Sequence, residues 1–231
     1  DAIQRPWEDY FTVVQWDQRQ TGKSYYSADD ENNPLTIDQF IEDTEEVILY
    51  LRQYFNQEKL FLLGHSWGSA IGMHMAKNHP DWLHAYIGLG QVVNWIDGEG
   101  ILYNRLLGHA KEQNESELVI MLEAIIPSLG AEFPVREKSF SENCDSVREA
   151  LSRLAGEALM HHFSFDDALK MLSFDQLISP HRTLTDVTNS LVGDKAAIFR
   201  PPNRFTQEFM DIDLPTEIGS SFELPIFFFT G

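Results

Sequence analysis

The sequence predicts an α/β fold, in which a mostly parallel sheet with crossover helices carries an inserted helical cap. Strand-like and helical segments alternate over residues 11–90, and such alternation is typical of parallel sheets. A glycine-flanked serine turn at residues 64–68 joins one strand-like segment to a helical one. A long helical stretch then ends in a strand-like run at residues 224–231, which indicates that the chain returns to the sheet.

The composition is that of a globular protein. Hydrophobic residues make up 43% of the 231 residues and aromatic residues 12%, enough for a substantial core. The chain has 17 basic and 36 acidic residues, which give a formal net charge of −19. The electrostatic field of so negative a protein repels nucleic acid and anionic membrane surfaces. We therefore expect no nucleic acid and no membrane as a partner.

Cys144 is the single cysteine, so no disulfide can form within the chain. No stretch approaches the ~18 consecutive apolar residues of a transmembrane helix, and the first residues lack the pattern of a signal peptide. We expect a cytoplasmic protein. No pair of histidines has metal-ligand spacing with an accompanying carboxylate, so we expect no metal and no other cofactor.

The first expected element is a buried strand over residues 11–16, because this run is β-branched and aromatic. A polar turn closed by Gly22 follows it. We expect Asp17 and Arg19 to hold this turn in shape by pairing and by backbone hydrogen bonds. A direct catalytic role for these two residues is the less favoured alternative.

The second expected element is an amphipathic helix from Ile37 to Phe55. Thr36 is a good N-cap, and Gln39 stands where a capping box needs its partner. Apolar residues recur at spacings of three and four along the helix, while its outer face is acidic. The helix leads into the strand before the serine turn, as a crossover helix would.

The serine turn has the sequence Gly64-His65-Ser66-Trp67-Gly68 and lies between the apolar run 60–63 and a helical segment with small residues in its first turn. This order of strand, sharp turn and helix is the context of a nucleophile elbow. Such a turn holds its serine in a strained backbone conformation. We expect the chain to crowd Gly64 and Gly68, so that only residues without a Cβ atom fit there.

In this interpretation Ser66 is the nucleophile. The strain lifts the Ser66 hydroxyl above the edge of the sheet, where a histidine can take its proton. The backbone N–H of Trp67 then points at the developing oxyanion, and the helix dipole favours negative charge there.

A strand is expected at residues 84–90, and the alternation stops after it. We assign residues 1–97 to the core, residues 98–215 to a helical cap and residues 216–231 to the returning core. Ligands of such sheets bind outside the carboxyl ends of the strands, so this cap would shape the substrate pocket. The helices expected in the cap cover residues 101–111, 117–129, 146–160, 165–172 and, in a shorter one, 203–210.

These motifs resemble the α/β-hydrolase superfamily and, within it, the prolyl iminopeptidase-like branch. The residues that carry the resemblance are Trp-Asp-Gln-Arg at 16–19, Thr-Gly-Lys-Ser at 21–24 and the serine turn with Ser69. The likeness covers nearly the whole chain but is specific only in these motifs. It implies a serine hydrolase that works through an acyl-enzyme, most simply an aminopeptidase that releases N-terminal residues, often proline, from small peptides.

The sequence also departs from the family pattern. The family has glycine where this chain has Gln20, and its His-Gly-Gly-Pro-type loop, which supplies the second oxyanion N–H, does not occur. The family's triad order would place the acid just after the strand that ends at Gly231. We therefore expect an internal segment of a longer enzyme, with strands missing at both ends and no catalytic competence by itself. Seven histidines of the chain could in principle act as the general base for Ser66, but none is favoured: His65, His74, His79, His109, His161, His162 and His181.

The resemblance also suggests a place for the substrate. Aminopeptidases of this branch hold the substrate's ammonium group with carboxylates of the cap. Asp97, Glu99 and Glu157 lie in the matching region, and Glu99 is the candidate for substrate binding. The partner implied is a small peptide, amide or ester substrate; the oligomeric state is open.

Two other functions are weighed. The first is a carboxylic-ester or lactone hydrolase, which relatives in the superfamily provide. The second is a non-catalytic hydrolase-fold protein that binds a small molecule, although an unused strained serine would cost about 1–3 kcal/mol. Serine in the turn, where epoxide hydrolases and haloalkane dehalogenases have a carboxylate, argues against those two branches.

Overall fold

The computed structural model describes most of the chain in three continuous stretches. These are residues 5–24, 35–125 and 211–229, together with residues 185, 205, 208 and 209. The chain divides into two compact units. One unit is formed by residues 30–108 and 202–231, and the other by residues 1–29 and 109–201.

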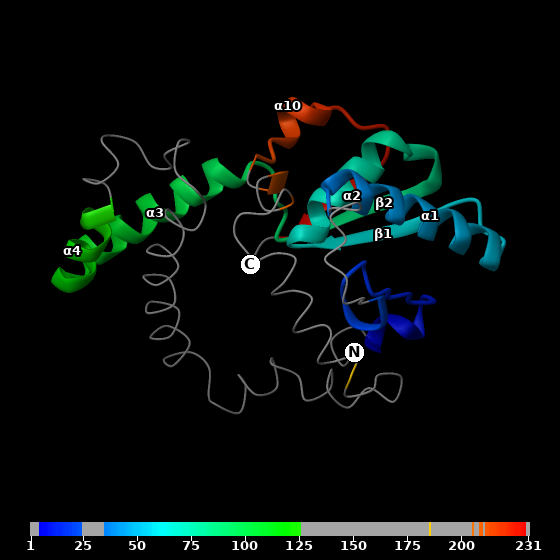
Figure 1. The fold of residues 1–231 in the computed structure, drawn as a ribbon, viewed down its shortest axis with the longest axis horizontal. Helices are drawn as coiled ribbons and strands as arrows, with labels where there is room; N and C mark the ends of the chain where they lie inside the picture. The colour runs from blue at the N-terminus through cyan, green and yellow to red at the C-terminus, as the bar shows by residue number, and fades with distance from the viewer. Residues whose placement is uncertain are drawn as a thin grey trace. The chain divides into compact units, whose positions relative to one another are not determined.

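The first unit contains a parallel sheet of three strands in the order β1-β2-β3, of which Figure 1 labels β1 and β2. The strands are β1 (Leu60–His65), β2 (Leu83–Leu89) and β3 (Ile226–Phe229). His65 lies opposite Leu89, and Leu89 lies opposite Phe229, so the carboxyl ends of all three strands meet at one edge. The structure confirms the parallel sheet and the returning strand. β3 pairs directly with β2, although residues 90–225 separate the two strands in the sequence.

Helix α1 (Ile37–Phe55) confirms the helix expected from the sequence. The Thr36 hydroxyl accepts a hydrogen bond from the Gln39 N–H at 3.2 Å, which satisfies one donor of the first turn. A second donor, the Ile37 N–H, is satisfied by Glu208 Oε2 at 2.8 Å. The helix ends at Asn56, whose left-handed backbone directs its N–H at the last carbonyls.

Helix α2 (Trp67–Asn78) is the centre of this unit. It contacts β1 and β2 on one side, and α1 and the short helix α10 (Leu214–Ile218) elsewhere (Figure 1). Most of its residues from Ser69 to Ala76 are buried. The small residues among them, Ser69, Ala70, Gly72 and Ala76, let the helix lie close to the sheet. The buried core around it consists of Ile48, Ala70, Met73, Met75, Ala76, Leu83, Tyr86, Phe209, Ile212 and Leu214.

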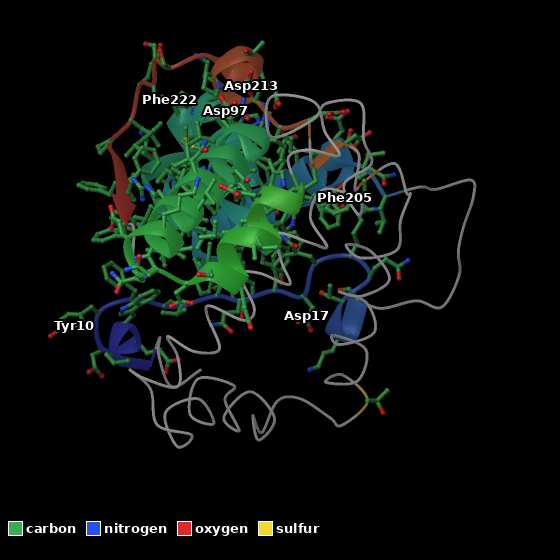
Figure 2. All side chains as sticks on the ribbon, turned by 90° about the vertical axis from the view of Figure 1, so that its left-hand side faces the viewer. Tyr10, Asp17, Asp97, Phe205, Asp213 and Phe222 are labelled. Atoms are coloured by element: carbon green, nitrogen blue, oxygen red, sulfur yellow. The ribbon has the colours of Figure 1, made fainter. Side chains whose placement is uncertain are left out.

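Helix α3 (Trp95–Glu112) leaves the sheet edge after β2. Its start is joined to the start of α10 by an isolated bridge between Asn94 and Asp213. Figure 2 labels Asp97 and Asp213 at these two helix starts. The described backbone just before α3 and just before α10 is therefore adjacent.

The second unit contains the end of α3 and helix α4 (Ser116–Ile125), together with the short helical turns η1 (Arg5–Asp9) and η2 (Gly22–Ser24). Helices α3 and α4 confirm those expected from residues 101 and 117 onward, as far as residue 125. The helices expected at residues 146–160 and 165–172 lie outside the described residues. The proposed core and cap boundaries stay predictions.

The strand expected at residues 11–16 is wrong for the described structure. Residues 12–18 have no regular secondary structure, and Phe11 and Val14 are 57% and 43% exposed. An extended segment becomes a strand only when a neighbouring strand accepts and donates its backbone hydrogen bonds. No described strand pairs with this one.

In the polar turn that follows, Asp17 holds the backbone by hydrogen bonds, as expected from the sequence. Its carboxylate accepts a hydrogen bond from the Lys23 N–H at 3.1 Å, and its carbonyl accepts one from the Ser24 hydroxyl at 2.9 Å. The same carboxylate lies over Gly22, where an added Cβ atom would collide with it. Gln20, which replaces the family's glycine, has a φ of 63°. The turn therefore keeps the left-handed conformation that glycine adopts at lower cost.

We expect Gln20→Gly to raise the free energy of unfolding of the full-length protein by about 1 kcal/mol, because glycine removes the steric cost of the positive φ. Denaturant unfolding measures the change. Gln18→Gly is the matched control: Gln18 has no positive φ, so the extra freedom of glycine should lower stability. A lower stability of Gln20→Gly would contradict the strain.

Candidate active site

Ser66 stands at the carboxyl edge of the sheet, between the end of β1 and the start of α2. Its backbone has φ 52° and ψ −123°, and the residue is exposed. A positive φ is uncommon for a residue other than glycine or asparagine and costs of order 1–3 kcal/mol. The structure therefore has the strained strand-to-helix turn that the sequence predicts, with the serine accessible at the edge where ligands of such sheets bind.

The two glycines of the turn differ in their surroundings. A Cβ atom on Gly64 would lie 2.5 Å from the Gly68 carbonyl oxygen and 2.8 Å from the Ser69 Cα atom, so the expected crowding is present. At Gly68 the expectation of crowding is wrong, because an added Cβ atom would meet no described atom within 4 Å. Gly68 is the second residue of α2, and the space beside its Cα atom is open.

Backbone hydrogen bonds hold Ser66 on both sides. Its N–H donates to the Leu89 carbonyl at the end of β2, at 3.0 Å. Its carbonyl accepts from the Ser69 N–H at 2.9 Å and from the Ser69 hydroxyl at 2.5 Å. The Ser66 side chain itself forms no hydrogen bond with any described residue. The backbone is thus fixed while the hydroxyl stays available.

Trp67, the first residue of α2, packs its indole ring into an aromatic cluster. The ring lies 5.4 Å from Phe40 of α1, 4.9 Å from Phe205 and 5.5 Å from Phe209 between centroids. Phe205, labelled in Figure 2, is only 2% exposed. The cluster fixes the residue whose backbone N–H, at the positive end of the helix dipole, is the candidate oxyanion donor.

Comparison with known proteins places this chain in a family. Residues 3–191 match the family of the alpha/beta hydrolase fold, and this is more than half of the chain. The chain belongs to the α/β-hydrolase family. The α/β-hydrolase fold predicted from the sequence is therefore confirmed.

The name of one relative is consistent with the branch of α/β hydrolases that the sequence resembles. A Bacillus subtilis protein named "Probable aminopeptidase YbaC" is 41% identical over 128 residues, which are 55% of this chain and 39% of that protein. The match thus covers less than half of the relative's length.

Two solved structures also match the chain, at lower sequence identity. A proline iminopeptidase-related protein from Thermus thermophilus has a TM-score of 0.41 and 17% identity, over 99% of this chain and 75% of that one. An epoxide hydrolase from Vigna radiata has a TM-score of 0.41 and 16% identity, over 93% and 61%.

The described histidines of this α/β hydrolase are engaged away from Ser66 or exposed. His74 lies 3.3 Å from Glu217 Oε2, and His79 Nε2 lies 2.7 Å from Glu45 Oε1. The exposed residues are His65, His84 and His109. No described histidine is hydrogen-bonded to the Ser66 hydroxyl. The other candidates, His161, His162 and His181, lie outside the described residues.

The candidate substrate carboxylates are only partly described. Asp97 is exposed in the first turn of α3, where its N–H donates to Asn94 Oδ1 at 2.9 Å. Glu99 is also in the first turns of α3, but its side chain is outside the description, as is all of Glu157. Among the described residues no three His, Cys, Asp or Glu side chains gather as a metal site would need. No described helix combines the length and apolarity needed to cross a membrane.

The His74–Glu217 pair links α2 to α10 and makes stability depend on pH. Burial lowers the pKa of His74 below its ordinary value of 6.5, while the charge and hydrogen bond of Glu217 oppose that shift. Just below pH 6.5, His74 is therefore still neutral in the folded protein, whereas the same histidine is protonated in the unfolded chain. The contribution of His74 to stability is therefore present above pH 6.5 and is lost as the pH falls below that value.

We expect Glu217→Gln to lower the pKa of His74 further and to steepen the loss of stability below pH 6.5, because the opposing charge is gone. NMR titration of the His74 ring measures the pKa. Thr216→Val is the control: it removes a hydroxyl that donates to Asp213 at the start of α10 and leaves the carboxylate beside His74 in place. A higher His74 pKa in Glu217→Gln would refute the assignment.

Proposed function

We propose that this α/β hydrolase is a serine aminopeptidase of the prolyl iminopeptidase type, with Ser66 as its nucleophile. The observation that carries the proposal is the conformation of Ser66: exposed, with φ 52°, at the carboxyl edge of the sheet and the start of α2. Strained backbone conformations cluster at active sites, where the strain is part of the mechanism. The same position supplies the helix N-terminus that an oxyanion needs.

In the proposed reaction the Ser66 Oγ attacks the carbonyl carbon of the first peptide bond, and its proton passes to a histidine base. The Trp67 N–H donates to the oxyanion of the tetrahedral intermediate. When the intermediate collapses, the C–N bond breaks and the leaving amine takes the proton. Water then hydrolyses the ester of Ser66 and releases the N-terminal residue. We assign the histidine, its acid and the second oxyanion donor to residues other than the described ones.

The choice of aminopeptidase rests on two observations. The Bacillus subtilis relative is named a probable aminopeptidase. The net charge of −19 favours a cationic ligand, such as the ammonium group at a peptide's N-terminus. We propose Glu99 as a carboxylate that binds this ammonium group.

The test compares substrates with a free and a blocked amine on the full-length protein. We expect kcat/KM for proline p-nitroanilide to exceed that for its N-acetyl derivative by at least about 100-fold, because the ammonium pocket loses its ligand. Equal cleavage of both compounds, or cleavage of p-nitrophenyl esters alone, would favour the ester hydrolase instead. No turnover of any of these compounds would favour the small-molecule-binding protein.

The role of Glu99 is tested separately. Glu99→Gln should raise KM for proline p-nitroanilide and leave the rate with p-nitrophenyl acetate unchanged. Glu117→Gln, which removes the same charge from the exposed first turn of α4, is the matched control. An unchanged KM in Glu99→Gln would remove Glu99 from the proposal.

A further inference from the structure

A buried hydrogen-bond network lies next to the serine turn and takes no part in the proposed chemistry. Its centre is Ser69, which is fully buried in the first turn of α2. The Ser69 hydroxyl donates to the Ser66 carbonyl at 2.5 Å and accepts from the Val92 N–H at 2.9 Å. One side chain therefore joins the backbone of Ser66 to the loop between β2 and α3.

Two further side chains hold Ser69 in place. The Tyr86 hydroxyl, on β2, lies 3.0 Å from the Ser69 carbonyl oxygen and 2.7 Å from Gln91 Oε1. The Gln91 Nε2 group donates to the carbonyls of Ser69, at 3.1 Å, and of Val92, at 2.7 Å. The amide of Gln91 thus connects the same two pieces of chain that the Ser69 hydroxyl connects.

The surrounding backbone leaves space for this network. A Cβ atom on Gly72 would collide with the Tyr86 ring, and one on Gly88 would collide with the Gln91 amide oxygen. Gly72 lies inside α2 and Gly88 inside β2, where glycine otherwise weakens an element. Burial also raises the pKa of Tyr86, so its hydroxyl keeps its proton and continues to donate. The network is therefore a built feature of the fold.

We propose that Ser69 is a positioning residue that, held by Tyr86 and Gln91, keeps the Ser66 backbone in the conformation needed for attack. This inference rests on the proposed role of Ser66 as the nucleophile. A strained residue keeps its conformation only when its surroundings over-determine it. The Ser69 hydroxyl donates to the Ser66 carbonyl and also accepts from the Val92 N–H, so it ties the Ser66 backbone to Val92.

The test measures how fast a fluorophosphonate reacts with Ser66 in the full-length protein, followed by intact mass. We expect Ser69→Ala to slow this reaction by about tenfold or more, because small misplacements of a reacting group cost rate steeply. Tyr86→Phe should slow it less but in the same direction. Thr44→Val is the matched control, since the buried Thr44 hydroxyl donates to the Phe40 carbonyl at 2.7 Å within α1, apart from this network.

The outcomes separate positioning from simple stability. A slower reaction in Ser69→Ala, with Thr44→Val at the wild-type rate, supports the inference. A wild-type rate in Ser69→Ala, or an equal slowing in Thr44→Val, overturns it and leaves the role of Ser66 intact. If Ser69→Ala does not fold, Tyr86→Phe decides by the same comparison. If the wild-type protein is not modified at Ser66, both the proposed function and this inference fall.

Discussion

Ser66→Ala is expected to lower kcat/KM of the full-length protein by at least about 10³-fold, because the acyl-enzyme cannot form without the hydroxyl. Alanine keeps the Cβ atom, so the strain and the stability should change little. Ser66→Gly should be equally inactive but more stable by about 1 kcal/mol, because glycine adopts a positive φ freely. Turnover of proline p-nitroanilide and denaturant unfolding measure the two effects.

The matched control for Ser66 is Ser221→Ala, which removes the hydroxyl of an exposed serine in the same compact unit. Its activity and stability should equal those of the wild type. Ser66→Ala with wild-type turnover would rule out the nucleophile. Ser66→Gly with lower stability would show that the turn is not strained.

Gly64→Ala is expected to destabilise the protein by about 2–3 kcal/mol and to lower activity by about 100-fold. The new methyl group would lie 2.5 Å from the Gly68 carbonyl oxygen and 2.8 Å from the Ser69 Cα atom. Both are backbone atoms of the first turn of α2, so they cannot rotate away. Either β1 and α2 must separate or the turn must open, and each change displaces Ser66.

Gly68→Ala is the matched control, because the same methyl group there meets no described atom within 4 Å. It lies in a helix, where alanine is favoured over glycine by up to about 1 kcal/mol, so stability should be equal or higher. Thermal unfolding and kcat/KM of both variants measure the difference. Equal effects of the two substitutions would contradict the steric account of the turn.

The features that could be predicted are those written in contiguous sequence. The turn at Ser66 is local, because strand, glycines and helix follow one another within residues 60–76. Thr36 caps α1 through a neighbour three residues away, which is also local. The parallel sheet followed from the alternation of elements, and the returning strand followed from the apolar run at the end of the sequence.

The features that could not be predicted depend on contacts between distant residues. Glu208 caps α1 at Ile37 from 171 positions away, and no local sequence pattern predicts this contact. The strand expected at residues 11–16 needed a pairing partner that composition alone does not supply. The network around Ser69 had one usable signal, since Gly72 and Gly88 inside a helix and a strand mark places where another group comes close.

The most direct test of the central claim is peptide mapping of the full-length protein after treatment with a fluorophosphonate. We predict one adduct, on the Oγ of Ser66, and none in Ser66→Ala. An adduct on a different residue, or an unmodified Ser66 under conditions that label a known serine hydrolase, would contradict the account.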